Sequence, residues 1–441
     1  MNPEFKRNLW LVFTPQRLIV TPILLALVFA SVAMFNKIDF VNNLYGLARI
    51  MFVFIVWFWG LRSANSSITN ELRDKTWDQQ RMCALQPWAM TWGKLFGATA
   101  FEWYAGLICL IVAGIFGWMA QGSSAIVNLL TLVSIAILIH ALSIALNLHT
   151  SQFESRAIQQ GGVGWFGLFI LFIIWSVSAK WFAFESIDWW GMAFPAAYFL
   201  LFGGLLFACC AVFSAWRSMS NALQVRTIPW AWPLFAIVLA VYMAGFVSDT
   251  NSLYVFFTTA LLVAVAMTYI ALITEPTGLL VWQRLKRRQE LGDWRGWLER
   301  LPLWPTTLLL AFAFALLASF NLTGWIGTPS LNLFFGLAPL GVALMLLRDV
   351  CVFLFFTLAP NAKRTFSSAL FYLIVIDLLL PFLAQIAGLN YLRYLLLPVD
   401  LMNPWNGVFI MLIHAGIAFG LFCWRLRLRL RLRSELNTNF S

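Results

Sequence analysis

The amino-acid sequence predicts an all-α integral membrane protein with about twelve transmembrane helices, and three observations support this prediction. First, 61% of the 441 residues are hydrophobic and only 11% are charged, whereas soluble domains carry about 25% charged residues. Second, the apolar residues form blocks of about 20, the length that a helix needs to cross the hydrocarbon core. Third, the alternating pattern of barrel strands does not occur, and only helices or closed barrels satisfy their backbone in lipid.

The predicted elements follow one another from the N-terminus. Residues 2–17 place Phe5 and Trp10 among Lys6 and Arg7, a pattern that favours an amphipathic helix lying in the cytoplasmic interface. We expect six spans in the first half, at residues 18–35, 44–61, 95–120, 125–148, 163–179 and 192–215. We expect six more in the second half, at residues 231–247, 252–274, 305–326, 331–350, 368–388 and 405–424.

The basic residues predict that both ends of the chain lie in the cytoplasm. With the N-terminus inside, most of the lysines and arginines, Arg348 included, fall in cytoplasmic segments, and the opposite side receives Lys37, Lys180 and Arg393. This asymmetry is the positive-inside pattern. A missed span would move every later loop to the opposite side of the membrane and would destroy the asymmetry. The net charge of +11 is therefore explained by loop bias, and we expect no nucleic-acid partner.

Residues 62–94 form the longest polar stretch of the first half. Ile68 and Leu72 lie one helical turn apart within it and are surrounded by charges. Such a helix can fit a groove on a partner protein. A solvated loop is the alternative interpretation, and it applies equally to the basic stretch at residues 275–304.

Residues 62–106 resemble the export-type, or type two, permeases of ABC transporters. Those permeases have an acidic residue, a short basic stretch and a threonine between spans two and three, and a Gly-Lys pair that opens span three. Here Glu71, Arg73, Lys75 and Thr76 take the first positions, and Gly93-Lys94 takes the last. The interfacial helix and the aromatic block between Trp181 and Trp190 are similar as well. The resemblance covers residues 1–225, a six-span unit with its coupling segment at 62–94.

The resemblance implies a permease subunit of an ATP-driven export complex in the bacterial cytoplasmic (inner) membrane. The chain has no Walker A pattern, so we expect no enzymatic activity and no cofactor on this chain itself. ATP and Mg²⁺ are expected on partner ATPase subunits. The other expected partners are a second permease chain, identical or different, and membrane lipids. The ATPase-coupling residues implied are Glu71, Arg73, Lys75, Thr76 and Trp77.

Residues 226–441 add a further six-span region, which we interpret as a degenerate repeat or an accessory half. Its counterpart loop, residues 360–368, lacks the Glu-and-Thr pattern. The tail at residues 425–433 alternates arginine with leucine, and period two is typical of a strand. Because the tail directly follows a span, we expect instead a helical extension whose arginines reach lipid headgroups.

Ionisable residues inside the predicted spans are Glu102, His140 and Asp377, and Arg348 and Asp349 lie together at the cytoplasmic end of the tenth span. They indicate either a proton or substrate path, or structural groups that pair with one another. The three histidines are scattered, so we expect no metal site and no catalytic residues. Two functions other than ATP-driven export stay open: a non-transporting membrane scaffold or maturation factor, and a proton-coupled secondary carrier.

Overall fold

The computed structural model describes residues 2–35, 39–74, 76–82, 85–151, 185–225, 229–247, 253–275, 278–320, 339–358, 365–389 and 404–438. The chain divides into two compact units. Unit 1 consists of Met1–Ile187 and Ala193–Thr227, and unit 2 consists of Asp188–Met192 and Ile228–Ser441. The expected span at 163–179, residues 181–184 of the aromatic block, Lys75 and most of the 360–368 loop lie outside the described residues.

The described residues contain nine helices that are long and apolar enough to cross a membrane, and two shorter apolar helices, Ala231–Ala244 and Trp304–Phe320. The chain is therefore a multi-pass membrane protein built from α-helices. The strands found within the described ranges form one two-stranded sheet, β1 (Ser186–Trp189) and β2 (Met192–Pro195). The helix expected from residue 192 consequently begins at Ala196.

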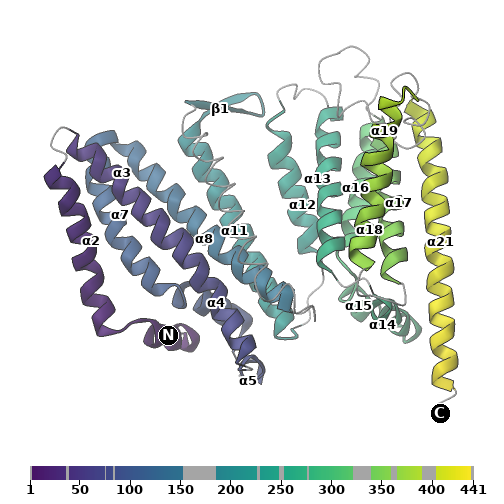
Figure 1. Ribbon diagram of the computed structural model, residues 1–441, viewed down its shortest axis with the longest axis horizontal. Helices are drawn as coiled ribbons and strands as arrows, with labels where there is room; N and C mark the ends of the chain where they lie inside the picture. Colours follow the sequence, from purple (N-terminus) through teal and green to yellow (C-terminus); the bar gives the residue numbers. More distant parts are fainter. Residues whose placement is uncertain are drawn as a thin grey trace. The chain divides into compact units, whose positions relative to one another are not determined.

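Unit 1 is a row of packed helices in which α2, α3, α7, α8 and α11 lie side by side (Figure 1). Glycine allows α7 to approach η1 and the end of α3 closely, because a Cβ atom at Gly106 would lie 2.4 Å from Val56 Cγ2 and 3.2 Å from Phe52 Cε2. The elements are α1 (Pro3–Val12), α2 (Pro15–Phe35), α3 (Phe40–Phe52), the π-helix η1 (Val53–Trp59), α4 (Gly60–Arg73), α5 (Trp77–Met82), α6 (Pro87–Trp92), the π-helix η2 (Gly93–Gly97), α7 (Ala100–Gln121), α8 (Ser123–Ser151) and α11 (Ala196–Ala222).

The second membrane helix of unit 1 is longer than the sequence predicted. The prediction ended it at residue 61, but α3, η1 and α4 form one continuous helix. The candidate span within this helix, Phe40–Glu71, has 32 residues, of which those after residue 61 are mostly polar. At 1.5 Å per residue this length is roughly 48 Å, against about 30 Å for the hydrocarbon core. The helix therefore projects beyond the core. Most described residues of 62–94 are helical, so a solvated loop is the wrong description of this segment.

Unit 2 packs its helices in the pairs α12 with α13, α13 with α16, α16 with α17, and α17 with both α18 and α21. Fully buried alanines, among them Ala264, Ala271, Ala311 and Ala315, let α13 and α16 approach closely. The elements are α12 (Ala231–Ala244), α13 (Leu253–Thr274), α14 (Leu279–Glu290), α15 (Trp294–Leu298), α16 (Trp304–Phe320), α17 (Pro339–Thr357), α18 (Thr365–Ile374), the π-helix η5 (Val375–Leu379), α19 (Leu380–Ile386) and α21 (Pro404–Thr438).

Two features of unit 2 decide between sequence interpretations. The tenth span was predicted at residues 331–350, but α17 continues to Thr357. Arg348 and Asp349 therefore lie inside a helix and not at its end, and counting Arg348 among the cytoplasmic charges was wrong. The basic tail belongs to α21, which continues through Thr438. The helical extension is thus confirmed, and its first arginine, Arg425, lies 4.2 Å from the ring centroid of Phe355.

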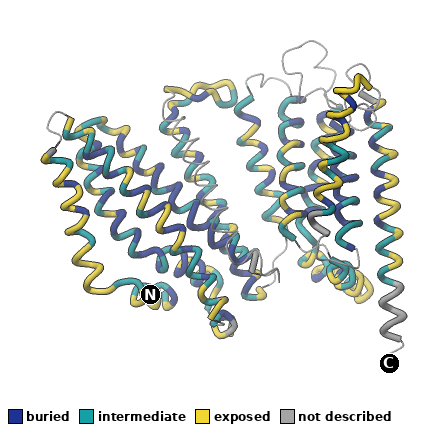
Figure 2. The backbone as a smooth tube through the Cα atoms, in the orientation of Figure 1, coloured by how far each residue is buried: buried dark blue, intermediate teal, exposed yellow. Residues whose placement is uncertain are grey.

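Large apolar side chains are exposed along several membrane helices. On α2, Ile19, Ile23 and Leu27 are all more than half exposed, and Figure 2 shows α2 as largely exposed. By contrast, α8 is the most buried of the long apolar helices described in unit 1. In a multi-pass membrane protein, exposed apolar side chains are the surface that faces the lipid tails.

Candidate functional site

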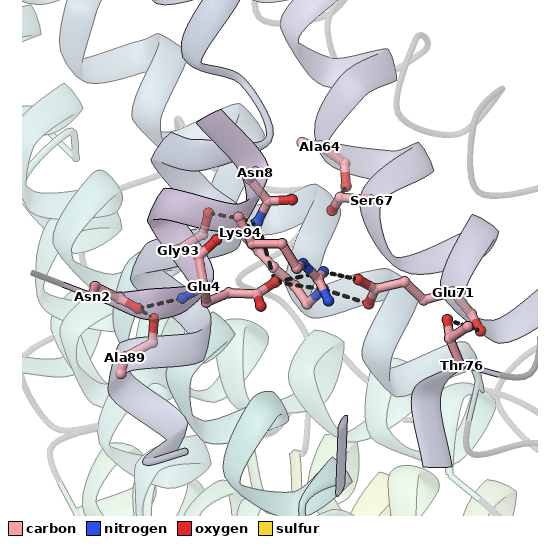
Figure 3. Close-up of polar contacts among 11 residues, drawn as sticks. Asn2, Glu4, Asn8, Ala64, Ser67, Glu71, Thr76, Ala89, Gly93 and Lys94 are labelled. Carbon is pink, nitrogen blue, oxygen red and sulfur yellow. Dashed lines mark hydrogen bonds and ion pairs between the residues drawn. The ribbon is translucent and has the colours of Figure 1, made fainter. Parts of the chain in front are cut away.

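Lys94 lies at the centre of a cluster of charges where α1, α4 and η2 meet in unit 1. Its side chain is only 1% exposed. Its Nζ atom forms an ion pair with Glu71 Oε2 and lies 3.4 Å from Glu4 Oε1. Figure 3 shows Glu4 and Glu71 approaching Lys94 from opposite sides. Two residues of the sequence motif, Glu71 and Lys94, are thus brought together.

Arg7 completes the cluster from the surface. Its Nη2 atom lies 2.9 Å from Glu4 Oε1 and 2.5 Å from Glu71 Oε1. Each cation therefore contacts each carboxylate, and the positive and negative charges balance. Because a buried charge is tolerated only when it is paired, this arrangement explains how Lys94 can be excluded from water. We call Glu4, Arg7, Glu71 and Lys94 the clamp.

Two glycines of η2 form the seat for α1. A Cβ atom at Gly93 would lie 2.6 Å from Glu4 Cγ, and a Cβ atom at Gly97 would lie 3.0 Å from Asn8 Cβ. The Gly-x-x-x-Gly spacing places both positions on one face, so that a helix can approach closely. Asn8 Nδ2 then donates to Glu4 Oε1 at 3.1 Å and to the carbonyl oxygen of Gly93 at 3.3 Å.

Thr76 and Trp77, which follow α4 and open α5, support the clamp. The amide of Thr76 donates to the carbonyl oxygen of Glu71 at 3.0 Å, which ends the helix next to the Glu71 side chain. The Trp77 ring is buried, and its centroid lies 5.7 Å from Lys94 Nζ, in range for a cation–π contact. Of the described coupling candidates, Arg73 differs: its side chain is 75% exposed and lies 3.5 Å from Asp74.

The apolar face of α4 is used inside unit 1. Ile68 is fully buried in a core that includes Trp77, Met90 and Ile144. The expectation that Ile68 fits a groove on a partner is therefore wrong, because this side chain already packs against its own chain. The side chain of Leu72 is not among those that the structure describes.

Glu102 and His140 are both buried in unit 1, where each has a hydrogen-bond partner. Ser63 Oγ donates to Glu102 Oε1 at 2.5 Å. His140 Nε2 lies 2.8 Å from the carbonyl oxygen of Val56. Because a carbonyl oxygen only accepts, Nε2 is the ring nitrogen that carries the proton. Gly60 leaves room for this ring, since a Cβ atom there would lie 2.4 Å from His140 Nε2.

Unit 2 brings Arg348, Asp349 and Asp377 together. Arg348 Nε donates to Asp349 Oδ1 at 2.8 Å, and Arg348 Nη2 contacts Asp377 Oδ1. Tyr269 adds a hydrogen bond from its hydroxyl to Asp349 Oδ2 at 2.5 Å. Arg348 and Asp349 are 5% and 1% exposed. We call these four residues the unit 2 network. No group of three or more metal ligands is found in the described part of the chain.

Several site residues were missed by reasoning from the sequence. Glu4 and Asn8 lie one turn apart and are buried, whereas Trp10 on the same helix is 75% exposed. A polar stripe opposite the exposed tryptophan was therefore a usable signal for the inward face of α1. Tyr269 had no comparable signal, because it is a single tyrosine within an apolar block.

The chain was compared with protein-family models, with curated proteins and with solved structures. None of the three comparisons finds a match. The function is therefore argued from the clamp, from the unit 2 network and from the membrane helices that hold them.

Proposed function

We propose that this chain is the transmembrane permease subunit of an ATP-driven export complex, powered by separate cytoplasmic ATPase subunits. In this proposal the chain crosses the bacterial inner membrane about twelve times with both ends in the cytoplasm, and it pairs with a second permease chain. The observation that supports it most is the clamp, which fastens the end of a long membrane helix to two further elements.

The clamp gives unit 1 a way to transmit force. Glu71 lies at the end of the 32-residue helical stretch Phe40–Glu71, Lys94 lies in η2, which leads into α7, and Glu4 and Arg7 belong to α1. A push on the projecting end of α4 therefore moves α1 and α7 with it. Alternating access by rigid-body motion needs such a connection between a water-exposed contact and the membrane helices.

The exposed face of α1 fits a position in the membrane interface. Trp10 and Leu11 are 75% and 70% exposed, whereas Glu4 and Asn8 are buried against the protein. A helix that buries Glu4 and Asn8 against the protein and exposes apolar side chains beside Lys6 and Arg7 is suited to the boundary between headgroups and acyl chains. Through the clamp, α1 then connects the end of α4 to the membrane surface.

The contact with the ATPase is assigned to the exposed side chains beyond the clamp. Arg73 and Asp74 are 75% and 59% exposed, and Met82 is 81% exposed. They lie beyond the hydrocarbon core, where a soluble partner can reach them. Glu71 acts within the clamp, and Thr76 and Trp77 support the clamp, so none of the three is assigned to the contact. ATP and Mg²⁺ are bound by the partner chains.

The proposal is tested by purifying the full chain from its native membranes in mild detergent and measuring bound ATPase subunits by mass spectrometry and ATP hydrolysis. We expect ATPase subunits with the unchanged chain and with Arg73→Lys, and their loss with Arg73→Glu at an unchanged thermal unfolding midpoint. If no ATPase subunit co-purifies, or if Arg73→Glu retains it in full, the proposal is wrong.

A proton-coupled carrier is the second candidate, and the unit 2 network favours it. The two candidates separate in vesicles that contain the purified chain without ATPase subunits. If a pH gradient alone drives transport in these vesicles, and if Asp377→Asn abolishes that transport, the proton-coupled carrier replaces the ATP-driven proposal.

A further inference from the structure

The unit 2 network has an unbalanced charge. Arg348 contributes one positive charge, and Asp349 and Asp377 contribute two negative charges if both are ionised. Asp349 lies near the middle of α17, and Asp377 lies in η5, between α18 and α19. A net negative charge inside a membrane-spanning bundle is costly, because water does not stabilise it there. A single bound proton would remove the excess.

We propose that Tyr269, Arg348, Asp349 and Asp377 form a proton-binding site in the membrane-spanning part of unit 2, which holds one proton on Asp377 and exchanges it there. This inference goes beyond the proposed function and does not depend on ATPase coupling. It assigns to unit 2 a chemical role that unit 1 does not have in the ATP-driven proposal.

The contacts distinguish the two carboxylates. Asp349 accepts hydrogen bonds at both oxygens, from Arg348 at Oδ1 and from Tyr269 at Oδ2. Donors to both oxygens favour the ionised form of a carboxylate. Among the described residues Asp377 contacts one partner, Arg348 Nη2, and its side chain is 21% exposed against 0% for Asp349. Asp377 is therefore the carboxyl that carries the proton and the one through which the proton enters and leaves.

Arg348 can stabilise the network after the proton has left. Its Nη1 atom is buried without a hydrogen-bond partner among the described residues. When Asp377 releases its proton, its second oxygen becomes a free acceptor, and Nη1 and Nη2 together can form the bidentate fork that arginine makes with a carboxylate. The network then changes from neutral to one negative charge, and one proton is released.

The backbone around Asp377 is suited to a local rearrangement. Asp377 lies within the π-helix Val375–Leu379, and single π-helical turns occur frequently at functional sites. Pro381 follows in α19. Because proline has no amide hydrogen, it cannot bond the carbonyl of the residue four positions earlier, which is Asp377. The segment that holds the exchanging carboxyl is thus less tightly bonded than a regular helix.

The other titratable groups near the network must be considered in any pH experiment. The helix α16 contributes none within its described residues. The titratable groups on the elements packed against α17 are Tyr254 and Tyr269 on α13, Tyr372 on α18, and His414, Cys423 and the arginines from Arg425 onward on α21, and α17 itself adds Arg348 and Cys351. The helix α19, which packs against η5, contributes none.

The test is infrared spectroscopy of the purified chain in lipid nanodiscs at a series of pH values from about 5 to about 9, a range around the neutral point. A protonated carboxyl group absorbs infrared light at a different frequency from an ionised carboxylate. Glu275, whose pKa burial raises to about 7, supplies one protonated carboxyl signal in this range. We expect a second protonated carboxyl signal that titrates with pH and is lost in Asp377→Asn, whereas His414→Gln, which removes a neighbouring titratable group, retains both signals. If the unchanged chain and Asp377→Asn show the same signals at every pH, the proposal is wrong.

Thermal unfolding of the same samples supplies an independent readout. A network that already holds a proton on Asp377 is neutral, so Asp377→Asn leaves its charge unchanged and should retain the unfolding midpoint. Arg348→Gln removes the only cation and should lower the midpoint strongly. If Asp377→Asn lowers the midpoint as much as Arg348→Gln does, Asp377 is an ionised structural partner of Arg348, and the proton-binding assignment is overturned.

Discussion

At the scale of single residues, burial and pairing decide what each charged side chain does. Lys94 is excluded from water beside Glu4 and Glu71, whereas Arg73 is largely exposed beside Asp74. Both belong to one sequence motif, yet only Arg73 is available to a soluble partner. Arg73 lies on the exposed side of α4, whereas Lys94 of η2 is buried where η2 meets α1 and α4.

Removing one partner of the clamp should expose the cost of burying Lys94. Glu71→Gln leaves a buried cation with Glu4 as its only close carboxylate. Breaking a buried pair in this way costs about 3–5 kcal/mol, and we expect a loss of that order in the free energy of unfolding, measured in detergent. Arg73→Gln, at an exposed position, should change it by less than about 0.5 kcal/mol. Equal losses in the two variants would contradict the clamp.

A second residue-scale prediction concerns the contact of Gly60 with His140. Gly60→Ala places a Cβ atom in the space of the imidazole and should cost about 1–3 kcal/mol of stability by overpacking. The double variant with His140→Ala removes the clash, so the two effects should not add. Additive losses, measured by the same unfolding experiment, would show that the ring does not occupy this space.

At the scale of elements, α1 and η2 show how small residues and polar side chains together position a helix. Gly93 and Gly97 permit the approach, and Asn8 bonds across it. The element α1 is therefore docked on the protein through its polar face, while Trp10 on its other face is exposed.

The docking of α1 can be tested with one glycine and a matched control. Gly93→Ala should loosen α1, because the new Cβ atom meets Glu4 and the backbone of Phe5. Tryptic cleavage after Lys6 and Arg7 requires local unfolding, so its rate should rise several-fold. Gly114→Ala in α7 has no atom within 4 Å of the new Cβ and should leave the rate unchanged. Unchanged cleavage in Gly93→Ala would mean that α1 is not seated on η2.

A buried carboxyl group links two elements of unit 2. Glu275, just after α13, accepts a hydrogen bond from the amide of Leu303 at 2.6 Å, next to the start of α16. Burial raises the pKa of Glu275 from 4.5 to about 7, although the amides of Leu303 and Trp304 act in the opposite direction. The folded protein therefore binds this proton more tightly than the unfolded chain does.

The sign of the resulting pH dependence follows from this difference. The contribution of Glu275 to stability is full below its unfolded pKa of 4.5 and is lost as the pH rises through about 7. Glu275→Gln should remove this fall, on the order of 3 kcal/mol, as measured by unfolding at a series of pH values. Glu290→Gln, at a side chain that is 62% exposed, should follow the unchanged chain. A curve for Glu275→Gln that parallels the unchanged chain would contradict the assignment.

The sequence predicted the elements better than their ends and contacts. Long apolar blocks identify membrane helices because lipid requires them, so α2, α7, α8 and α13 were recognisable. The extension of the second helix past residue 61 was not, because its polar residues are covered by tertiary contacts such as the clamp. Likewise Asp377 was visible as a charge within a predicted span, whereas Arg348 was expected at the cytoplasmic end of another. The pairing of Arg348 with Asp377, which lies in a π-helix, depends on packing that no local pattern encodes.

At the scale of the whole molecule, the two units contain different polar centres. Unit 1 has a charge-balanced clamp at the projecting end of a membrane helix, and unit 2 has an unbalanced network among its membrane helices. Because Arg348 lies inside α17, the number of basic residues assigned to the cytoplasm falls by one. The basic residues of α14 and of the C-terminal part of α21 are still assigned to the cytoplasm. The prediction of two cytoplasmic ends thus retains its main support.

The central claim is that Arg73 faces an ATPase in the cytoplasm, and site-specific photo-crosslinking in native membranes tests it most directly. A crosslinker placed at position 73 should capture a chain that mass spectrometry identifies as an ATPase subunit. A crosslinker at Ser124, an exposed residue in the first turn of α8 on the predicted opposite side of the membrane, should capture none. Capture of the ATPase from Ser124, or its absence at position 73, would contradict the account.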